Sequence, residues 1–404
     1  MRIECIAIGT ELLTTRRLDT NSVWLAERLA DLGLAFQRKT AVGDDRADMA
    51  RLFREALERS ELIVCTGGLG PTFDDFTKEL WAEVAGVPMH EDAQSRADLL
   101  AWYARRNRVP SDNNFKQVLF PEGSEPLPNP VGSAPGVWWE WRGRRIVLLP
   151  GVPREMKRMW EERVEPRLAG LAGQATHTLR MVVAGVPESA LDERTRPLRE
   201  KHGGMEWTIL ASLHQVELVA RGADRAALDA AQADFSAELG PDLVRTGSGD
   251  LEDAVLDLLK ARGETLAVAE SMSGGMLASR LTSIPGASEA FLGGATVYTV
   301  KAKVALADAD AAFTRRHGTV SEPVTESLAE GIRTKLGATW ALAITGNAGP
   351  TEDPEGPAPV GTTIIALAGP EVLECRRYEF AGDREDIRQR ACGWALDLLR
   401  RKLA

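Results

Sequence analysis

At 404 residues the chain is too long for one ordinary hydrophobic core, so two or three domains are expected. Hydrophobic residues make up 44% of it and charged residues 27%, which is typical of a soluble globular protein. The net charge of −10 argues against broad binding to nucleic acid or to anionic membranes, and no apolar run reaches membrane-spanning length.

The cysteines argue against a disulfide framework and against zinc. Cys5, Cys65, Cys375 and Cys392 lie far apart with no CxxC spacing, and three of them sit in apolar runs. The first residues enter a strand without the apolar core of a signal peptide. We therefore expect reduced core cysteines in a cytoplasmic enzyme.

Strands expected over residues 2–8, 34–42 and 62–65 alternate with helices, which predicts a parallel sheet covered on both faces. Asn21 is expected to cap the first long helix and Gly33 to close it. Ligands of such sheets bind where the strands end. Glu11, Asp44 and residues 66–75 fall at strand ends, so we expect them to share one pocket.

The stretch CTGGLGPTFDD (residues 65–75) follows a buried strand and precedes a helical pattern. Three glycines at such a turn let the backbone approach phosphate oxygens with its N–H groups. The adjacent carboxylates Asp74 and Asp75 would then need a divalent cation between them and the phosphate. The alternative is a plain turn followed by an acidic first helical turn that favours the helix dipole.

A helix over 92–106 and a strand over 117–120 are followed by a hairpin of 136–141 with 144–149, and by a helix from Arg154. Glu155 either faces the shared pocket or only partners the helix dipole. Trp138, Trp139 and Trp141 either lie exposed, as a dimer contact would require, or alternate into the local core.

The middle of the chain is predicted as a small α+β unit without a nucleic-acid-binding signature, serving as a spacer or for dimerisation. Its strands are expected at 178–184, 206–211 and 216–221, and its helices at 188–199 and 225–238. The sequence TGSGD (246–250) is the best linker candidate. A second α/β unit follows, with helices over 251–262, up to 336 from a Ser321 cap, and from about 384, and with strands over 265–269, 295–299, 340–344, 361–367 and 375–378.

Ser271 stands where a nucleophile would, at a strand end with helix N–H groups behind it to stabilise an oxyanion. His317 is the only histidine of this region, so a Ser-His-Asp arrangement has little support, and Tyr298 with Lys303 offers another way to activate the serine. The alternative makes Ser271 a helix cap and Tyr298 a core aromatic. Residues 345–349 add backbone donors at a neighbouring strand end.

Several motifs carry a family resemblance. AESMSGG (269–275), Val297-Tyr298 with Lys303, GTVSE (318–322) and ITGNAGP (344–350) resemble the nicotinamide-mononucleotide deamidase domain. GTELL (9–13), DTN (19–21), VGDD (42–45), residues 66–75 and LPGVP (149–153) are similar to the molybdopterin-cofactor-biosynthesis-like domain. In this order they resemble the CinA family of competence/damage-inducible proteins.

The resemblance implies an α/β protein, with two three-layer α/β domains (1–170 and 247–404) joined by a small α+β KH-like domain (171–246). It implies that the C-terminal domain hydrolyses the carboxamide of nicotinamide mononucleotide to nicotinate mononucleotide and ammonia without a cofactor. Ser271 would be the nucleophile, activated by Tyr298 and Lys303. The residues that would hold the substrate are Ser273, Gly274, Gly275, Thr345, Gly346, Asn347, Ala348, Gly349 and, at its phosphate, Arg384.

For the N-terminal domain the resemblance implies a metal-dependent ADP-ribose pyrophosphatase that gives AMP and ribose 5-phosphate. Mg²⁺ or a transition metal such as Co²⁺, with K⁺ as a further ion, would be held by Glu11, Asp44, Asp74 and Asp75. The substrate would contact Thr10, Asn21, Thr66, Gly67, Gly68, Gly70, Pro71 and Thr72.

The chain departs from the family pattern at Met272, Ser273 and Asn347, and in the acidic loop with Glu352, Asp353 and Glu355. The expected partners are the two small nucleotides and a second copy in a homodimer, without direct nucleic-acid or membrane contact. Two alternatives remain open. One is a single-activity enzyme whose other domain binds a nucleotide or pterin without turnover, and the other is a competence-related scaffold.

Overall fold

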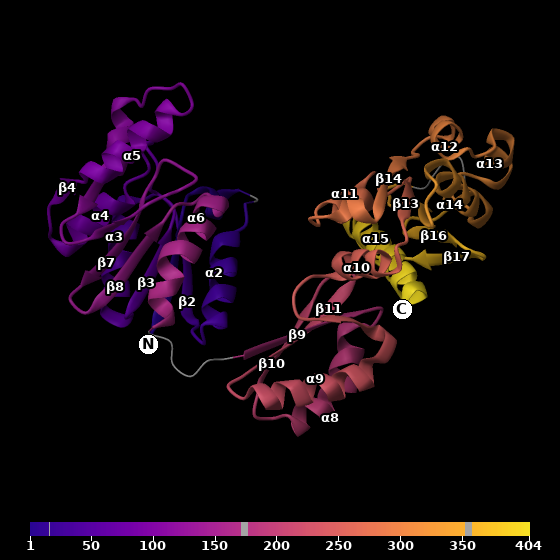
Figure 1. The fold of residues 1–404 in the computed structure, drawn as a ribbon, viewed down its shortest axis with the longest axis horizontal. Helices are drawn as coiled ribbons and strands as arrows, with labels where there is room; N and C mark the ends of the chain where they lie inside the picture. Colours follow the sequence, from indigo (N-terminus) through magenta and orange to yellow (C-terminus); the bar gives the residue numbers. More distant parts are fainter. Residues whose placement is uncertain (16, 171–176, 352–357) are drawn as a thin grey trace. The chain divides into compact units, whose positions relative to one another are not determined.

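The computed structural model describes residues 1–15, 17–170, 177–351 and 358–404. The chain divides into two compact units, residues 1–177 and 178–404, each with its own sheets and hydrophobic cores (Figure 1). Within the described residues, no helix combines the length and the apolar character needed to cross a membrane. The four cysteines are free, as predicted, and all but Cys375 are buried.

The first unit is built around one mixed sheet. Its strands are β1 (Ile3–Ile8), β2 (Phe36–Val42), β3 (Leu62–Thr66), β4 (Met89–Glu91), β5 (Leu119–Pro121), β6 (Glu125–Leu127), β7 (Gly136–Trp141) and β8 (Arg144–Leu149). In residues 1–15 and 17–170 the main sheet has the order β2-β1-β3-β8-β7-β6, and β4 pairs separately with β5. The strands β2, β1 and β3 are parallel, as the alternation predicts. The hairpin strand β8 joins them in parallel, which was not predicted, and β7 and β6 add an antiparallel edge.

Helices cover both faces of this sheet. They are α1 (Glu11–Thr14), α2 (Thr20–Asp31), α3 (Arg46–Arg59), α4 (Thr77–Ala85), α5 (Ala93–Ala104), α6 (Pro153–Met159) and α7 (Glu165–Ala169), with a π-helical segment (Trp160–Val164) between the last two. Successive strand residues point to opposite faces. Ile6 and Ile63 therefore pack with α3 and α4, whereas Cys5 and Val64 pack with α2 and the α6–α7 segment, which gives three layers (Figure 1).

Two local predictions for the first unit were wrong, and of the two alternatives for the hairpin tryptophans the exposed one is excluded. Asp19, not Asn21, caps α2, because its carboxylate accepts the Ser22 N–H group while Asn21 lies inside the helix. Residues 112–118 form a 3-10 helix, and only Leu119–Pro121 is strand. The tryptophans of the hairpin are not an exposed patch: Trp138 and Trp139 are buried in the two cores.

The second unit begins with a four-stranded sheet covered by two helices. Its elements are β9 (His177–Ala184), α8 (Glu188–Lys201), β10 (Glu206–Ala211), β11 (Gln215–Gly222), α9 (Arg225–Leu239) and β12 (Leu243–Thr246), and the strand order is β10-β11-β9-β12. In this sheet β10 pairs with β11, and β12 with β9, in antiparallel fashion. The edge strand β12 was not predicted. The expected linker after it is fixed to the sheet, because Arg180 donates to Gly249 O (2.5 Å) and to Asp250 Oδ1 (2.7 Å).

The rest of the second unit forms a five-stranded sheet in the order β14-β13-β15-β16-β17. Its elements are α10 (Leu251–Arg262), β13 (Leu266–Glu270), α11 (Met276–Thr282), β14 (Phe291–Thr296), α12 (Val300–Ala307), α13 (Ala311–His317), α14 (Glu322–Leu336), β15 (Trp340–Gly346), β16 (Thr362–Gly369), β17 (Val372–Glu379) and α15 (Arg384–Leu403). The first three strands in this order are parallel and the last two pairings are antiparallel.

The two faces of the five-stranded sheet differ in side-chain size. Leu266, Val268 and Ile344 pack against α10, α11 and α15. The opposite face is lined by alanines, such as Ala267 and Ala343, against α12 and α14. Small side chains on this face let α12 and α14 approach the sheet closely. Because helices pack on both faces, this domain has three layers, as predicted.

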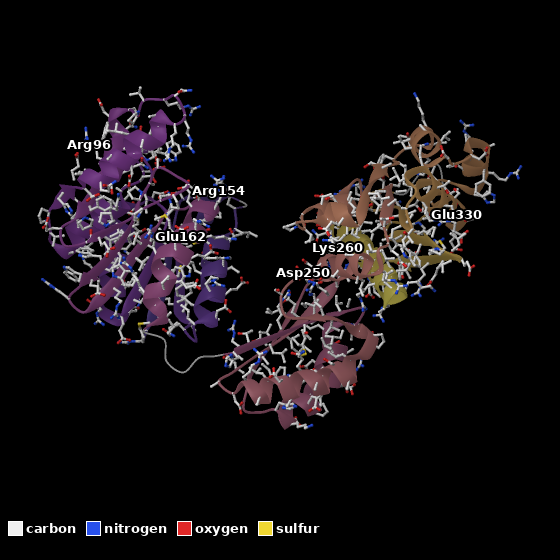
Figure 2. The ribbon with its side chains drawn as sticks, viewed as in Figure 1. Arg96, Arg154, Glu162, Asp250, Lys260 and Glu330 are labelled. Atoms are coloured by element: carbon white, nitrogen blue, oxygen red, sulfur yellow. The ribbon has the colours of Figure 1, made fainter. Side chains whose placement is uncertain are left out.

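Charged side chains cover the outside of both units (Figure 2). Exposed examples are Arg154 on α6, Glu162 in the π-helical segment, and Glu330 on α14. A charged group on the surface is therefore not informative by itself, and buried polar groups are the more informative ones.

Candidate functional sites

The loop of residues 67–75, here called the Gly loop, leaves the sheet at the end of β3. Its glycines are required by the chain itself. Gly67 and Gly68 have φ of 106° and 67°, and a Cβ atom would lie 2.2 Å from Ile8 O and 2.1 Å from Thr77 Oγ1, respectively. The loop thus packs tightly on β1 and on the start of α4, which fixes its backbone.

The predicted pocket exists at this edge of the sheet. Ala7 is in register with Ala41 and Thr66, so the segments that follow the three strands emerge side by side. They enclose a cavity of about 630 Å³, here called the Gly-loop cavity. The predicted residues that line it are Glu11, Asp44, Gly67, Gly68, Gly70, Pro71, Thr72, Asp74, Asp75 and Glu155. Asn21 and Thr66 line an adjoining cavity of about 300 Å³ that also contacts Glu11.

The carboxylates of the Gly loop are held by the loop. Thr72 donates to Asp75 Oδ2 through its N–H (3.0 Å) and its hydroxyl (2.5 Å). The same hydroxyl contacts Asp74 Oδ1 and lowers the pKa of Asp74 below its ordinary value. Because α4 begins at Thr77, neither aspartate lies in a first helical turn, and the dipole interpretation is wrong. Across the cavity, Asp44 Oδ2 accepts the Thr10 N–H group (2.8 Å).

These carboxylates do not form a ready metal cage. In the described residues no three His, Cys, Asp or Glu side chains lie close enough together to hold a metal ion. The donor type suits Mg²⁺, since hard cations prefer oxygen ligands, but the spacing does not provide a complete protein ligand set. The cavity walls alone therefore do not fit a resident metal.

Sequence reasoning missed two buried residues behind the Gly loop. Lys78 donates to Gln117 O (2.5 Å), its ammonium nitrogen lies 4.3 Å from the centre of the Phe120 ring, and burial lowers its pKa to about 7. Gln117 lines the Gly-loop cavity, and its Oε1 is buried without a partner in the part of the chain that the structure describes. Gln117 was missed because the sequence predicts a strand over residues 117–120, and no local motif indicates a role for its side chain.

The second site lies at the end of β13. Glu270 is in register with Thr296 and Ile344, so residues 271, 297 and 345 leave the sheet together. Lys303 reaches this point from α12, and its Nζ lies 3.1 Å from Ser271 Oγ and 2.7 Å from Val297 O. The Lys303 side chain is only 1% exposed, whereas Ser271 is partly open to solvent. The predicted pairing of Ser271 with a lysine is therefore present in the structure.

The helix behind Ser271 does not supply an oxyanion site as expected. The buried Glu270 carboxylate accepts the N–H groups of Gly275 (3.0 Å), Leu277 (3.0 Å) and Ala278 (2.8 Å). Ser271 is also not a helix cap, because α11 begins at Met276. Sequence reasoning gave Glu270 no role, although a carboxylate just before a Gly-rich helix start is a favourable partner for the helix N-terminus.

The turn between Ser271 and α11 contains free donors. Among the described residues, the N–H groups of Met272 and Ser273 make no hydrogen bond. Ser273 Oγ is likewise buried without a partner there, while Ser273 O accepts a bond from Arg388 (2.8 Å). Positive φ angles at Gly274 and Gly275 turn the chain into the helix. A nucleophile followed directly by free backbone N–H groups is the arrangement that stabilises an oxyanion.

Tyr298 is not where the sequence placed it. β14 ends at Thr296, so Tyr298 lies after the strand, and its side chain is 58% exposed. Its hydroxyl accepts a bond from Arg384 (3.1 Å), which also donates to Gly349 O (2.6 Å). Tyr298 and Arg384 thus lie together at the rim of the Ser271 site. The side chain that contacts the Ser271 hydroxyl is Lys303.

The loop after β15 is held by its own side chains. Thr345 is buried and its hydroxyl lies 2.6 Å from that of Thr325. Asn347 donates to Thr351 O and Ala358 O and accepts the Gly349 N–H group, so its side chain organises the loop. Gly346 is close to Met272, whose sulfur would lie 2.6 Å from an added Cβ, and Ala348 is buried. The acidic loop residues Glu352, Asp353 and Glu355, at which the chain departs from the family pattern, lie outside the described residues.

Comparison with known proteins gives concordant matches. Residues 4–170 match the family described as probable molybdopterin binding domain, and residues 248–403 match the CinA C-terminal domain. A CinA-like protein of Myxococcus xanthus is 41% identical over 416 aligned positions, covering 100% of this chain and 98% of the relative. One from Anaeromyxobacter dehalogenans is 40% identical and covers 99% of each chain. A crystal structure of CinA, of unknown function, from Thermoplasma acidophilum is 34% identical and covers 40% of this chain and 95% of its own, with a TM-score of 0.38.

Proposed function

This chain belongs to the CinA family, and from that premise we propose that its C-terminal domain is an amidohydrolase that converts nicotinamide mononucleotide to nicotinate mononucleotide and ammonia. The contact between Lys303 Nζ and Ser271 Oγ (3.1 Å) is the observation that carries this proposal. A serine needs a base to become a nucleophile, and a buried amine held against its hydroxyl is such a base.

The chemistry follows from the positions of these groups. Ser271 Oγ attacks the carboxamide carbon while Lys303 takes the hydroxyl proton. The negative charge that develops on the carboxamide oxygen is stabilised by the Met272 and Ser273 N–H groups. Lys303 then gives its proton to the nitrogen, ammonia leaves, and an ester on Ser271 remains. A water molecule, deprotonated by Lys303, hydrolyses the ester and regenerates the serine.

The rim would hold the rest of the nucleotide. Arg384 has donors left after its bonds to Tyr298 and Gly349, since a guanidinium carries five N–H groups. It is therefore the candidate for the substrate phosphate. Tyr298, at 58% exposure, is better placed to contact the ribose or the phosphate than to take part in proton transfer at Ser271.

A release assay for ammonia tests the proposal. The full chain should release ammonia from nicotinamide mononucleotide, and Lys303→Met should lower kcat by about 10²- to 10⁴-fold because the base is lost. Lys301→Met, two residues earlier on the same helix and exposed, is the matched control and should stay near the wild type. A Lys303→Met protein that keeps its activity would remove lysine from the mechanism.

For the N-terminal domain we propose ADP-ribose cleavage to AMP and ribose 5-phosphate. The supporting observation is that the fixed Gly loop and five carboxylates line one cavity of about 630 Å³. A diphosphate would lie along the Gly loop, and Asp74 and Asp75 would stand beside it. Divalent cations such as Mg²⁺ or Co²⁺, with K⁺, are proposed to enter with the substrate, whose oxygens would complete a ligand set that the cavity does not supply alone.

Offering ADP-ribose to the full chain with and without a divalent cation tests this activity. We expect AMP and ribose 5-phosphate only with the cation. Binding of ADP-ribose without cleavage under both conditions would instead support the alternative of a non-catalytic nucleotide-binding domain. Neither product from either substrate would favour the scaffold alternative.

A further inference from the structure

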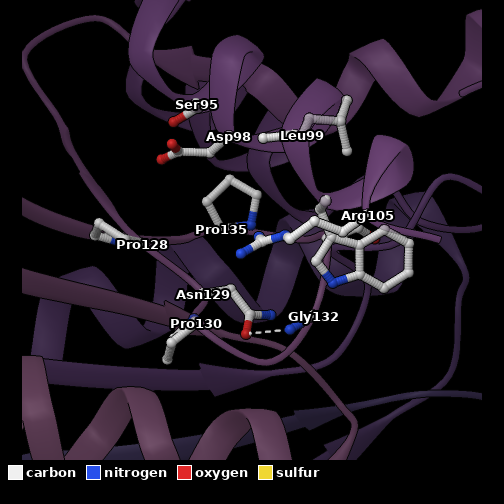
Figure 3. A pocket seen from close by; sticks show the side chains of 12 residues that line it. Ser95, Asp98, Leu99, Arg105, Pro128, Asn129, Pro130, Gly132 and Pro135 are labelled. Atoms are coloured by element: carbon white, nitrogen blue, oxygen red, sulfur yellow. Dashed lines mark hydrogen bonds between the residues drawn. The ribbon is translucent and has the colours of Figure 1, made fainter. Parts of the chain in front are cut away.

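A further cavity in the first unit is lined by none of the predicted site residues. It has a volume of about 460 Å³ and lies between α5 and the loop of residues 128–135 (Figure 3). We call it the α5 cavity. Pockets of 300–1,000 Å³ are typical of small-molecule sites, and a nucleobase with its ribose fits within this volume.

The α5 cavity adjoins the Gly-loop cavity. Ser133 lines both of them. On the loop that separates them, Asn129 donates to Glu155 Oε2 (2.6 Å) and accepts the Gly132 N–H group (2.8 Å). Gly132 packs so closely on Glu155 that an added Cβ would lie 2.1 Å from its carboxylate. A ligand that passes Ser133 would therefore occupy both cavities at once, with this braced loop between its two ends.

The walls of the α5 cavity suit a flat group that carries both donors and acceptors. Leu99 of α5 and Pro135 of the loop contribute apolar surface to the lining. The Arg105 guanidinium extends into the space between α5 and Pro135, and the Asp98 carboxylate lies on the α5 wall (Figure 3). The indole N–H of Trp102, which also lines the cavity, is buried and has no partner among the described residues.

An unpartnered buried donor costs free energy unless a ligand or water satisfies it. An aminopurine presents a ring nitrogen acceptor and an amino donor on its edge, which match the Trp102 N–H group and the Asp98 carboxylate. The Gly-loop cavity is a poorer place for the base, because five carboxylates line it. A diphosphate accompanied by cations belongs there instead.

We propose that the α5 cavity binds the purine base of the nucleotide whose phosphates lie in the Gly-loop cavity. This inference rests on the proposed ADP-ribose activity for the identity of the ligand, but it concerns binding and not cleavage. Trp102, Asp98 and Arg105 are then specificity residues of the N-terminal site.

Calorimetric titration of the full-length protein tests this, with AMP, GMP, UMP and inorganic pyrophosphate as separate probes in the presence of Mg²⁺. The wild type should bind AMP and GMP at least fivefold more tightly than UMP. Trp102→Phe keeps the ring and loses only the donor, so it should weaken AMP binding by about 5- to 10-fold, the value of one hydrogen bond, and leave pyrophosphate binding unchanged. Arg105→Gln should act in the same direction.

The matched control is Arg108→Gln, which removes the same charge from an exposed position near the end of α5 and should change nothing. The proposal is overturned if AMP does not bind, or if AMP and UMP bind equally well. It is also overturned if AMP binding is unchanged in both Trp102→Phe and Arg105→Gln. An equal loss of AMP and pyrophosphate binding also overturns it, as a structural effect. If AMP binds as described but ADP-ribose is not cleaved, the proposed hydrolysis fails while the base site stands.

Discussion

The Gly-loop site and the Ser271 site are both built where parallel strands end, yet they reach different degrees of completeness. At Ser271 the two groups that we propose to react are already in hydrogen-bonding contact, since the buried Lys303 amine of α12 lies 3.1 Å from the hydroxyl. At the Gly loop the walls are fixed, but no three metal-ligating side chains in the described residues come together. In our proposal the first site therefore acts with its own residues, whereas the second takes up a cation only together with oxygens of its ligand.

This contrast predicts that the two sites fail independently, and Ser271→Ala gives the largest expected effect. Without the nucleophile, deamidation of nicotinamide mononucleotide should fall by at least about 10³-fold. ADP-ribose cleavage should keep its wild-type rate, because Ser271 and the Gly loop belong to separate compact units. Both products are measured on the same preparation, and simultaneous loss of the two activities would contradict the two-site description.

Asp75→Asn probes the other side of the comparison with a smaller expected effect. The amide keeps the size of the carboxylate but loses the charge that would face a cation. We expect kcat for ADP-ribose to fall by about 10- to 100-fold, with a higher Mg²⁺ concentration at half activity. Deamidation serves as the internal control and should not change. An unchanged Mg²⁺ dependence would mean that Asp75 only shapes the Gly loop through Thr72.

The sequence predicts much of what these experiments rely on, because the strand-end positions follow from local patterns. The hydrophobic runs that become β3 and β13 place residues 66–75 and Ser271 correctly, and the hairpin bounds of β7 and β8 match the prediction. Convergence of Glu11, Asp44 and the Gly loop follows from the register of parallel strands. These features need only the period of a strand and the rule that ligands bind at strand ends.

What the sequence does not reveal is which polar group meets which across the fold. Glu270 takes the helix N–H groups that an oxyanion would have used, and Tyr298 lies at the rim with Arg384. The Asn347 side-chain amide forms its hydrogen bonds within its own loop. Each outcome depends on side-chain geometry between segments that are far apart or in turns, where hydrophobic periodicity carries no information.

The helix α11, which follows the Ser271 turn, is joined by a partly buried network to the loop before β11 of the neighbouring four-stranded sheet. His214, next to the start of β11, places its Nε2 2.9 Å from Arg280 on α11, and Arg280 also contacts Glu252 of α10. His214 packs on Gly393 of α15, where an added Cβ would lie 2.3 Å from the histidine Cβ. Burial, and then the charge of Arg280, lower the pKa of His214 from 6.5 to about 4.

This depressed pKa gives the smallest of the expected effects and tests whether the network stabilises the domain that carries Ser271. Between pH 6.5 and about 4 the unfolded chain binds a proton at His214 that the folded chain does not, so the free energy of unfolding decreases as the pH falls through that window. His214→Gln should remove about 1 to 2 kcal/mol of this acid sensitivity. Urea midpoints at pH 7 and pH 4.5 measure it, with His177→Gln as the control. Equal acid sensitivity of the wild type and His214→Gln would show that His214 is not held neutral by its burial, and the bracing of α11 would then depend on Arg280 and Glu252 alone.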